Sequence, residues 1–270
     1  MTLLVGVVIG VVLGLTGAGG SVFAVPLLIN FLGLSMQQAA GLSLGAVAIS
    51  ALFGVILKLR TGHIEWLPAL VFACLGSVGA PLGSWVGRRV DEKVLLVMFA
   101  VLVVIVATRM WQQASSRPEE TKVVRADREQ GHGTHAMCKQ NQGRRFQVGV
   151  PCVLGMSAGA LSTGVLSGLF GVGGGFLIVP ILLALTNISI RQAVATSLVV
   201  IACVGAVGFV NFVAFGSNIE MHILALLAMG GVVGMALGVF TSRYLAGPLL
   251  QKIFAILMFV ILAVTLVAKQ

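Results

Sequence analysis

The sequence predicts an all-α polytopic membrane protein of about eight hydrophobic helical units in two homologous four-unit repeats. Two observations predict this class. Of the 270 residues, 58% are hydrophobic and only 9% are charged, whereas soluble domains carry about 25% charged residues. The two halves of the chain also align with each other, and the first unit of each half is broken at a glycine-rich motif. A chain with so little polar surface has to bury most of its exterior in lipid.

Six uninterrupted apolar runs are long enough to span a bilayer, for which a helix needs about 20 residues. They are residues 36–57, 64–87, 94–111, 190–215, 221–242 and 249–268. Two further regions, residues 2–33 and 147–187, are longer than one spanning helix and contain the glycine clusters. These two regions complete the eight predicted units.

Residues 113–146 form a long polar stretch that divides the chain nearly in half. The stretch holds 11 of the 25 charged residues, seven of them basic, and its composition predicts a flexible linker. The predicted organisation is therefore a first membrane repeat over 1–112, a linker over 113–146 and a second membrane repeat over 147–270. Because basic residues accumulate in cytoplasmic loops, the linker is predicted to be cytoplasmic.

The relative orientation of the repeats depends on the broken units. If all eight units span once, the repeats are parallel and the linker side has 11 basic residues against 6. If the broken units are re-entrant hairpins, the repeats are inverted and the count is 13 against 4. The second count obeys the positive-inside rule better, but charge counting leaves both topologies open.

The internal repeat is clearest around the glycine clusters. Residues 14–28, GLTGAGGSVFAVPLL, align with 168–182, GLFGVGGGFLIVPIL, at an offset of 154 with eight of fifteen positions identical. The same offset aligns 35–49 with 189–203, and an offset of 155 aligns Glu65 with Glu220. Because the motif recurs in mid-chain, its first copy is expected to be part of the mature protein rather than a signal peptide.

The glycine clusters are the candidate substrate site. A break in a membrane helix is tolerable only where it faces protein or a water-filled cavity, and it leaves half-helices over 21–31 and 176–185 with free N–H groups near mid-membrane. Paired breaks of this kind are typical of transporter substrate sites, and such N–H groups favour anions. The predicted substrate-binding residues are Gly17, Gly19, Gly20, Ser21, Gly171, Gly173, Gly174 and Gly175, with Ser43, Ser197 and Thr196.

Other small and polar residues have competing interpretations. The regularly spaced glycines Gly79, Gly83, Gly87, Gly230, Gly234 and Gly238 are predicted to serve helix packing. A serine in a membrane helix often bonds a carbonyl of its own preceding turn, so the ligand role of Ser43 and Ser197 competes with that interpretation. Glu65 and Glu220 are predicted to stabilise helix N-termini, with coupling or gating as the alternative.

Several classes of function lack support in the sequence. The net charge of +9 is explained by basic loops, and no soluble stretch is long enough for a nucleic-acid-binding domain. The polar loop contains His132, His135 and Cys138, but three residues in a flexible segment do not predict a metal site. The four cysteines suggest no disulfide framework. No catalytic motif and no ATP-binding loop is found, so neither an enzyme nor a cofactor is expected.

The paired motifs GLTGAGGSVFAVPLL and GLFGVGGGFLIVPIL, one opening each half of the chain, resemble those of the TauE/SafE sulfite exporter family. The resemblance covers nearly the whole chain and implies a permease of a bacterial inner membrane that moves small sulfur-containing or organic anions, such as sulfite and sulfoacetate. The first copy departs from the fuller glycine run, because Ser21 stands where the second copy has Gly175. This difference leaves open whether the two halves contribute equally.

The expected function is secondary transport of a small anion by alternating access around the paired breaks. An anion channel or facilitator lined by the same helix ends is the alternative. Because no ATP-binding loop is present, any active transport is expected to use an H⁺ or Na⁺ gradient or a separate partner. The glycine-rich helix faces make a homodimer plausible.

Overall fold

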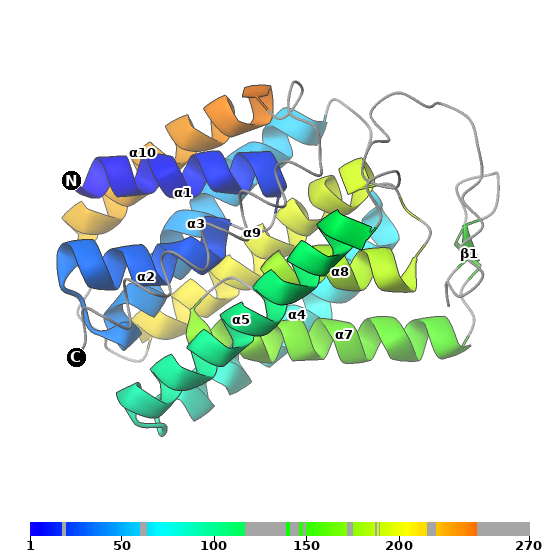
Figure 1. Cartoon of the computed structure of the whole chain (residues 1–270), viewed down its shortest axis with the longest axis horizontal. Coiled ribbons are helices and arrows are strands. Elements are labelled where there is room, and N and C mark those ends of the chain that lie inside the picture. The colour runs from blue at the N-terminus through cyan, green and yellow to red at the C-terminus, as the bar shows by residue number, and fades with distance from the viewer. Residues whose placement is uncertain are drawn as a thin grey trace.

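A computed structural model of the chain describes residues 1–17, 20–59, 64–116, 139–140, 146–147, 150–171, 175–186, 188, 190–214 and 220–241. Helices dominate these residues, as Figure 1 shows. The helices of the first half are α1 (Thr2–Thr16), α2 (Gly20–Leu32), α3 (Met36–Leu59), α4 (Trp66–Gly87) and α5 (Glu92–Ser116). Those of the second half are α7 (Val150–Phe170), α8 (Gly175–Leu185), α9 (Ile190–Ala214) and α10 (Met221–Thr241).

Five of the described helices are long and apolar enough to cross a membrane. They are Met36–Leu59, Trp66–Gly87, Cys152–Phe170, Arg191–Ala214 and Met221–Thr241. Shorter apolar helices cover Thr2–Thr16, Val22–Leu32 and Lys93–Ile105. The prediction of an all-helical, multi-pass membrane protein is therefore confirmed, whereas the predicted unit at 249–268 lies outside the described residues.

The two halves each begin with a helical hairpin. A β-carbon built on Gly20, at the start of α2, would lie 2.6 Å from the Leu13 Cβ of α1, so the chain turns back after α1. In the second half, a β-carbon on Gly159 of α7 would lie 2.8 Å from Ile181 Cγ2 of α8. In Figure 1 the α1–α2 hairpin occupies the left side, near the N-terminus, and the α7–α8 hairpin occupies the right side.

Helices of one half pack against helices of the other half in matching pairs. α3 and α9 lie against each other antiparallel, because Gly45 faces Phe209 whereas the later residue Ala48 faces the earlier residue Gly205. α1 packs parallel to α10, and α4 packs parallel to α7. α1 of the first half packs on α10 of the second half, and the corresponding helix α7 of the second half packs on α4 of the first half.

Glycine allows the parallel pairs to approach closely. A β-carbon on Gly79 would lie 2.9 Å from the Leu161 carbonyl oxygen, and one on Gly14 would lie 2.7 Å from the Met235 carbonyl oxygen. Each remaining spaced glycine of these helices likewise faces a backbone carbonyl oxygen of the neighbouring helix. These glycines are Gly83, Gly87, Gly230, Gly234 and Gly238. Their predicted packing role is confirmed, since a side chain at each of them except Gly87 would overlap the neighbouring backbone, and one at Gly87 would lie in tight contact with the Leu169 carbonyl oxygen, at 3.1 Å.

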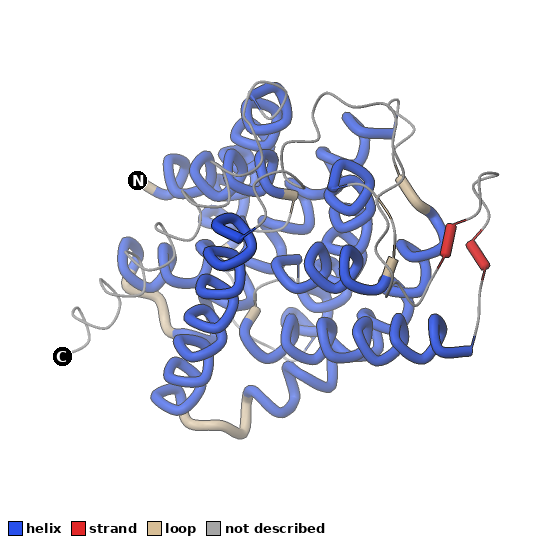
Figure 2. The backbone as a smooth tube through the Cα atoms, turned by 45° about the vertical axis from the view of Figure 1, so that its right-hand side comes forward, coloured by secondary structure: helices blue, strands red, loops and turns tan. Residues whose placement is uncertain are grey.

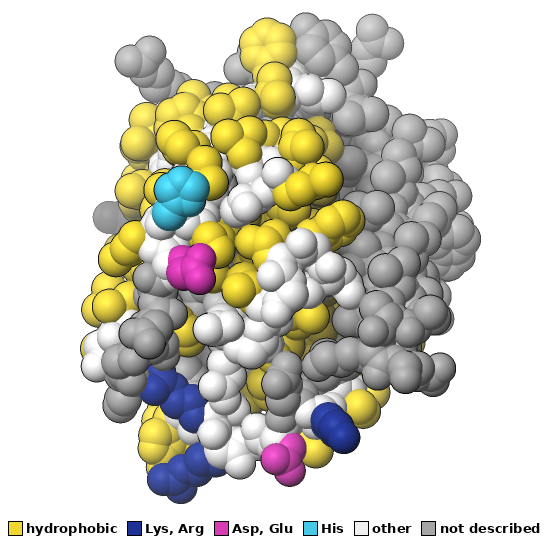
Figure 3. All heavy atoms as spheres, turned by 90° about the vertical axis from the view of Figure 1, so that its left-hand side faces the viewer, with side chains coloured by type: hydrophobic (Ala, Val, Ile, Leu, Met, Phe, Trp, Pro, Cys, Tyr) yellow, Lys and Arg dark blue, Asp and Glu magenta, His cyan; other side chains and the backbone are white. Residues whose placement is uncertain are grey.

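The outer surface suits a lipid environment. Large apolar side chains are exposed on several helices, including Leu52 on α3, Val78 on α4 and Leu237 on α10. Figure 3 shows the face at the left of Figure 1, where Lys and Arg side chains lie toward the lower edge and hydrophobic side chains cover much of the rest. Exposed apolar area of this extent is expected where lipid replaces water. Near the end of α4, Arg89 lies 3.7 Å from the Trp85 ring centroid, a cation–π contact.

The described part of the predicted linker is small. Strands β1 (Lys139–Gln140) and β2 (Phe146–Gln147) pair antiparallel, and Figure 2 shows them in red at the right-hand edge of the molecule. Cys74 and Cys203 are free, whereas Cys152 is disulfide-bonded. The cysteine spacing, which suggests no disulfide framework, did not indicate this cross-link, since spacing does not reveal which cysteines meet in space.

Candidate functional site

Gly17 and Gly171, which follow the first helix of each hairpin, have the same backbone conformation. We call these two residues the hairpin tips. α1 ends at Thr16, and Gly17 follows with φ +69° and an N–H that donates to the Leu13 carbonyl at 2.7 Å. α7 ends at Phe170, and Gly171 follows with φ +69° and an N–H that donates to the Ser167 carbonyl at 2.9 Å. Only glycine adopts this left-handed conformation at little cost.

Each tip glycine also touches a helix of the other half. A β-carbon on Gly17 would lie 2.9 Å from the Val194 Cβ of α9. A β-carbon on Gly171 would lie 2.8 Å from the carbonyl carbon of Ala40 in α3. Both tips are therefore closed in by the antiparallel α3–α9 pair. Glycine is required there for space as well as for conformation.

Two buried serines fix these tips across the halves. The Ser197 hydroxyl of α9 donates to the Gly17 carbonyl at 2.8 Å, and the Ser43 hydroxyl of α3 donates to the Gly171 carbonyl. Each hydroxyl also contacts a carbonyl of its own preceding turn, Val194 for Ser197 at 2.9 Å and Ala40 for Ser43 at 2.8 Å. The single hydroxyl proton of each serine is thus shared between the own-helix carbonyl expected of membrane serines and a carbonyl of the opposite hairpin.

The half-helices α2 and α8 follow the two hairpin tips. α2 starts at Gly20 and α8 starts at Gly175, both buried, and α2 and α8 contact each other. The first N–H groups of a helix have no partner within it and carry about half a positive charge. α2 packs against α3 and α8 packs against α9, so each of these helices lies beside one member of the antiparallel pair.

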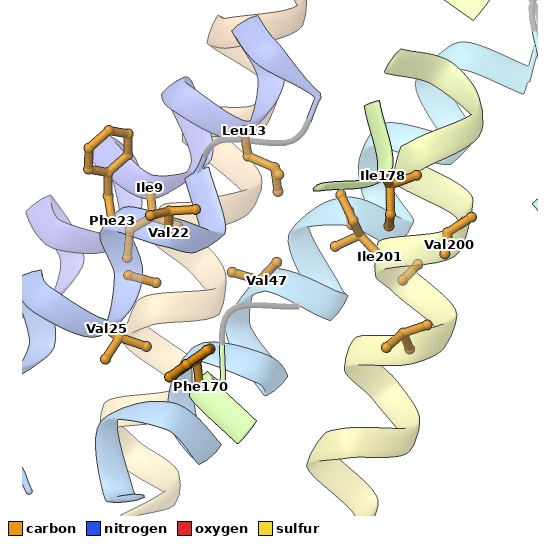
Figure 4. Close-up of a cluster of buried hydrophobic side chains, with 14 of the residues drawn as sticks. Ile9, Leu13, Val22, Phe23, Val25, Val47, Phe170, Ile178, Val200 and Ile201 are labelled. Atoms are coloured by element: carbon orange, nitrogen blue, oxygen red, sulfur yellow. The ribbon is translucent and has the colours of Figure 1, made fainter. Parts of the chain in front are cut away.

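The surroundings of the tips are apolar. Figure 4 shows Leu13 and Val22 of the first hairpin, Phe170 and Ile178 of the second, and Val47 of α3 among the buried side chains of this region. The buried polar side chains of the described residues are all hydroxyls: Ser43, Ser50, Thr163, Ser167, Thr186, Thr196 and Ser197. A site built here would bind with neutral donors and helix dipoles in a low-dielectric setting.

Thr196 lies beside Ser197 but has a different partner. Its hydroxyl oxygen accepts the backbone N–H of Glu65 at 3.1 Å, just before α4 begins. The Glu65 carboxylate accepts a hydrogen bond from the Gln192 side chain of α9 at 2.7 Å. Glu65 therefore links the start of α4 to the start of α9, and this contact to Gln192 was not predicted.

The remaining predicted site residues are placed only in part. Gly20 and Gly175 begin their helices, and Ser21 lies in the first turn of α2. Gly19, Gly173 and Gly174 lie outside the described residues, as do His132, His135 and Cys138. Within the part of the chain that is described, no group of three His, Cys, Asp or Glu residues could hold a metal ion.

The exchanged serine bonds predict a stability effect. Replacing Ser43 or Ser197 by alanine is expected to lower the free energy of unfolding by about 1 kcal/mol, because each change leaves a tip carbonyl without its cross-half donor. The effect is measured by denaturant titration in mixed micelles. Ser162→Ala is the matched control, since the exposed Ser162 hydroxyl bonds only the Ala158 carbonyl of its own helix. Equal stability of all three variants would contradict the tethering role.

Comparison with known proteins identifies related sequences. The sequence model of the family described as "Sulfite exporter TauE/SafE" matches residues 2–265. A "Probable membrane transporter protein" of Xylella fastidiosa (strain 9a5c) is 32% identical over 255 residues, which cover 93% of this chain and 88% of that protein. "Probable membrane transporter protein YunE" of Bacillus subtilis (strain 168) is 25% identical over 242 residues, 86% of this chain and 85% of that protein. No solved structure matches the chain.

Proposed function

The chain belongs to the sulfite exporter TauE/SafE family of membrane transporters, and we propose that it is a secondary transporter of small sulfur-containing anions. Sulfite, sulfoacetate and related organic anions are the proposed substrates. They bind between the hairpin tips and cross the membrane by alternating access around the paired glycine breaks. The predicted glycines and serines form or support this site.

The exchanged serine–glycine bonds are the observation that carries the proposal. Gly17 and Gly171 adopt the same left-handed conformation, and each carbonyl is held by a serine of the other half. Two helix starts, whose first N–H groups have no partner within their own helix, then lie in an apolar region where the buried polar side chains of the described residues are hydroxyls. Such a region favours an anion bound by oriented dipoles over a cation, which would require carboxylates or carbonyl oxygens.

We propose further that the two repeats are inverted. The corresponding helices α3 and α9 pack antiparallel, and a two-fold axis that exchanges antiparallel helices is perpendicular to them. If these helices cross the bilayer, the axis lies in the membrane plane, as in many transporters with inverted repeats. The two hairpins then enter from opposite sides, which agrees with their positions in Figure 1.

Corresponding residues of the two halves have different hydrogen-bond partners, and this difference supports alternating access. Glu65 is hydrogen-bonded to Gln192, whereas the corresponding Glu220 is exposed and the corresponding Gln38 accepts from the N–H and hydroxyl of Ser35 at 3.4 and 3.2 Å. Identical residue pairs in inverted repeats would exchange their contacts when the transporter exchanges its open side. We propose that the described conformation is one of these two states, with the Glu65–Gln192 contact closed.

The proposed location is a bacterial inner membrane, with the linker in the cytoplasm. Inverted repeats give the linker side 13 basic residues against 4, which the positive-inside rule favours. Coupling to H⁺ or Na⁺ and a homodimer stay predictions from the sequence.

The test is transport by the purified full chain in proteoliposomes. A thermal-shift screen against sulfite, sulfate, thiosulfate, sulfonates and carboxylates first identifies anions that stabilise the protein. Saturable uptake and counterflow of such an anion are expected for the carrier. Single-channel currents would favour the alternative of an anion channel, and failure of every anion in both assays would overturn the proposal.

A further inference from the structure

Ser167 is the one buried side chain of the described residues that has a polar atom without a hydrogen-bond partner. It lies in the last turn of α7 and is fully buried, with an exposed fraction of 0%. The other buried hydroxyls in this part of the chain all have partners: Ser43, Ser50, Thr163, Thr186, Thr196 and Ser197. A buried hydroxyl left unpaired is costly, which indicates that a partner is supplied from outside the chain.

The repeat shows which way position 167 faces. The corresponding residue of the first half is Leu13, whose carbonyl accepts the Gly17 N–H as the Ser167 carbonyl accepts the Gly171 N–H. Leu13 Cβ lies 2.6 Å from a β-carbon built on Gly20, so it faces the start of α2. The repeat therefore predicts that Ser167 faces the start of α8, a helix of 11 residues.

We propose that Ser167 is a ligand-binding residue whose hydroxyl, with the first N–H groups of α8, binds the oxyanion group of the transported anion. The proposal rests on the proposed function and deepens it. The hydroxyl donates one hydrogen bond to an anion oxygen, and the helix start supplies further donors and a favourable dipole. Because the first half has Leu13 in this place, the two half-sites differ, and the charged group of a sulfite or sulfonate binds on the α8 side.

The test compares Ser167→Ala with wild type by calorimetric titration of the full chain with sodium sulfite and with sulfoacetate. We expect the alanine variant to bind about tenfold or more weakly, since a hydrogen bond to a charged group is lost. Without ligand it should melt at the same or a higher temperature, because an unpaired buried hydroxyl has been removed. Ser167→Cys, with a weaker donor, should bind with intermediate affinity.

Thr163→Val is the matched control. Thr163 is buried in the same helix, but its hydroxyl already donates to the Ala160 carbonyl, so this variant should keep wild-type affinity. Unchanged affinity in Ser167→Ala overturns the assignment and leaves the proposed function intact. A lower melting temperature without ligand, with unchanged affinity, would make the hydroxyl structural and also overturn the assignment. If the wild type binds none of the screened anions, the proposed function fails and Ser167 loses its role with it.

Discussion

Replacing Gly171 by alanine is expected to abolish anion transport and to lower the free energy of unfolding by about 3 kcal/mol. The left-handed conformation costs a residue with a β-carbon about 1–2 kcal/mol. The added carbon would also lie 2.8 Å from the carbonyl carbon of Ala40, and relieving such overpacking costs about 1–3 kcal/mol. Uptake into proteoliposomes and denaturant titration in mixed micelles measure the two effects.

Gly33 provides the control that separates conformation from contact. It also has a positive φ, +65°, but a β-carbon there would meet nothing within 4 Å. Gly33→Ala should therefore lose only the conformational term and keep transport. Gly19→Val and Gly173→Val, at the positions that the sequence predicts to line the site, should stop transport while leaving membrane insertion intact. Wild-type transport by these variants or by Gly171→Ala would contradict a site built at the hairpin tips.

The exchange between halves explains what sequence reasoning missed. The aligned segments single out Gly17, Gly171, Ser43 and Ser197, and the structure pairs each of these glycines with a serine of the other half. The two interpretations of the serines, own-helix bond or ligand, did not include the bond that each makes to the other hairpin. A repeat in the sequence shows which residues correspond, but it does not show that each half completes the other. That information comes only from the packing of α3 against α9.

Asymmetry between the halves is harder still to predict. The sequence does not predict Ser167 as a site residue, because it aligns with Leu13 and the repeat therefore does not pair it with a second polar residue. Gln38 and Gln192 are the opposite case, since identical residues in aligned positions have different partners. One sequence feature does encode part of this difference: Thr196, which binds the Glu65 N–H, aligns with Leu42. The rest depends on which conformation the chain occupies, and a sequence alone describes no single conformation.

Crosslinking positions 65 and 192 is expected to reduce transport by more than about tenfold, because it removes one of the two states that alternating access requires. The experiment uses a variant without the four natural cysteines, carrying Glu65→Cys and Gln192→Cys, and a short thiol-reactive crosslinker. The two side chains are hydrogen-bonded at 2.7 Å, so crosslinking should proceed without anion. Transport should return when a reducible crosslinker is cleaved.

The corresponding pair, Gln38→Cys with Glu220→Cys, tests the second state. In the described conformation Gln38 bonds Ser35 and Glu220 is exposed, so this pair should crosslink slowly at rest and faster while an anion is being transported. Each single-cysteine variant, treated in the same way, controls for modification without crosslinking. Rapid transport through the crosslinked 65–192 pair would contradict alternating access and favour a channel, since a permanently open pore does not need this contact to open and close. The two pairs of variants therefore distinguish a carrier from a channel for whichever anion the proteoliposome assay identifies.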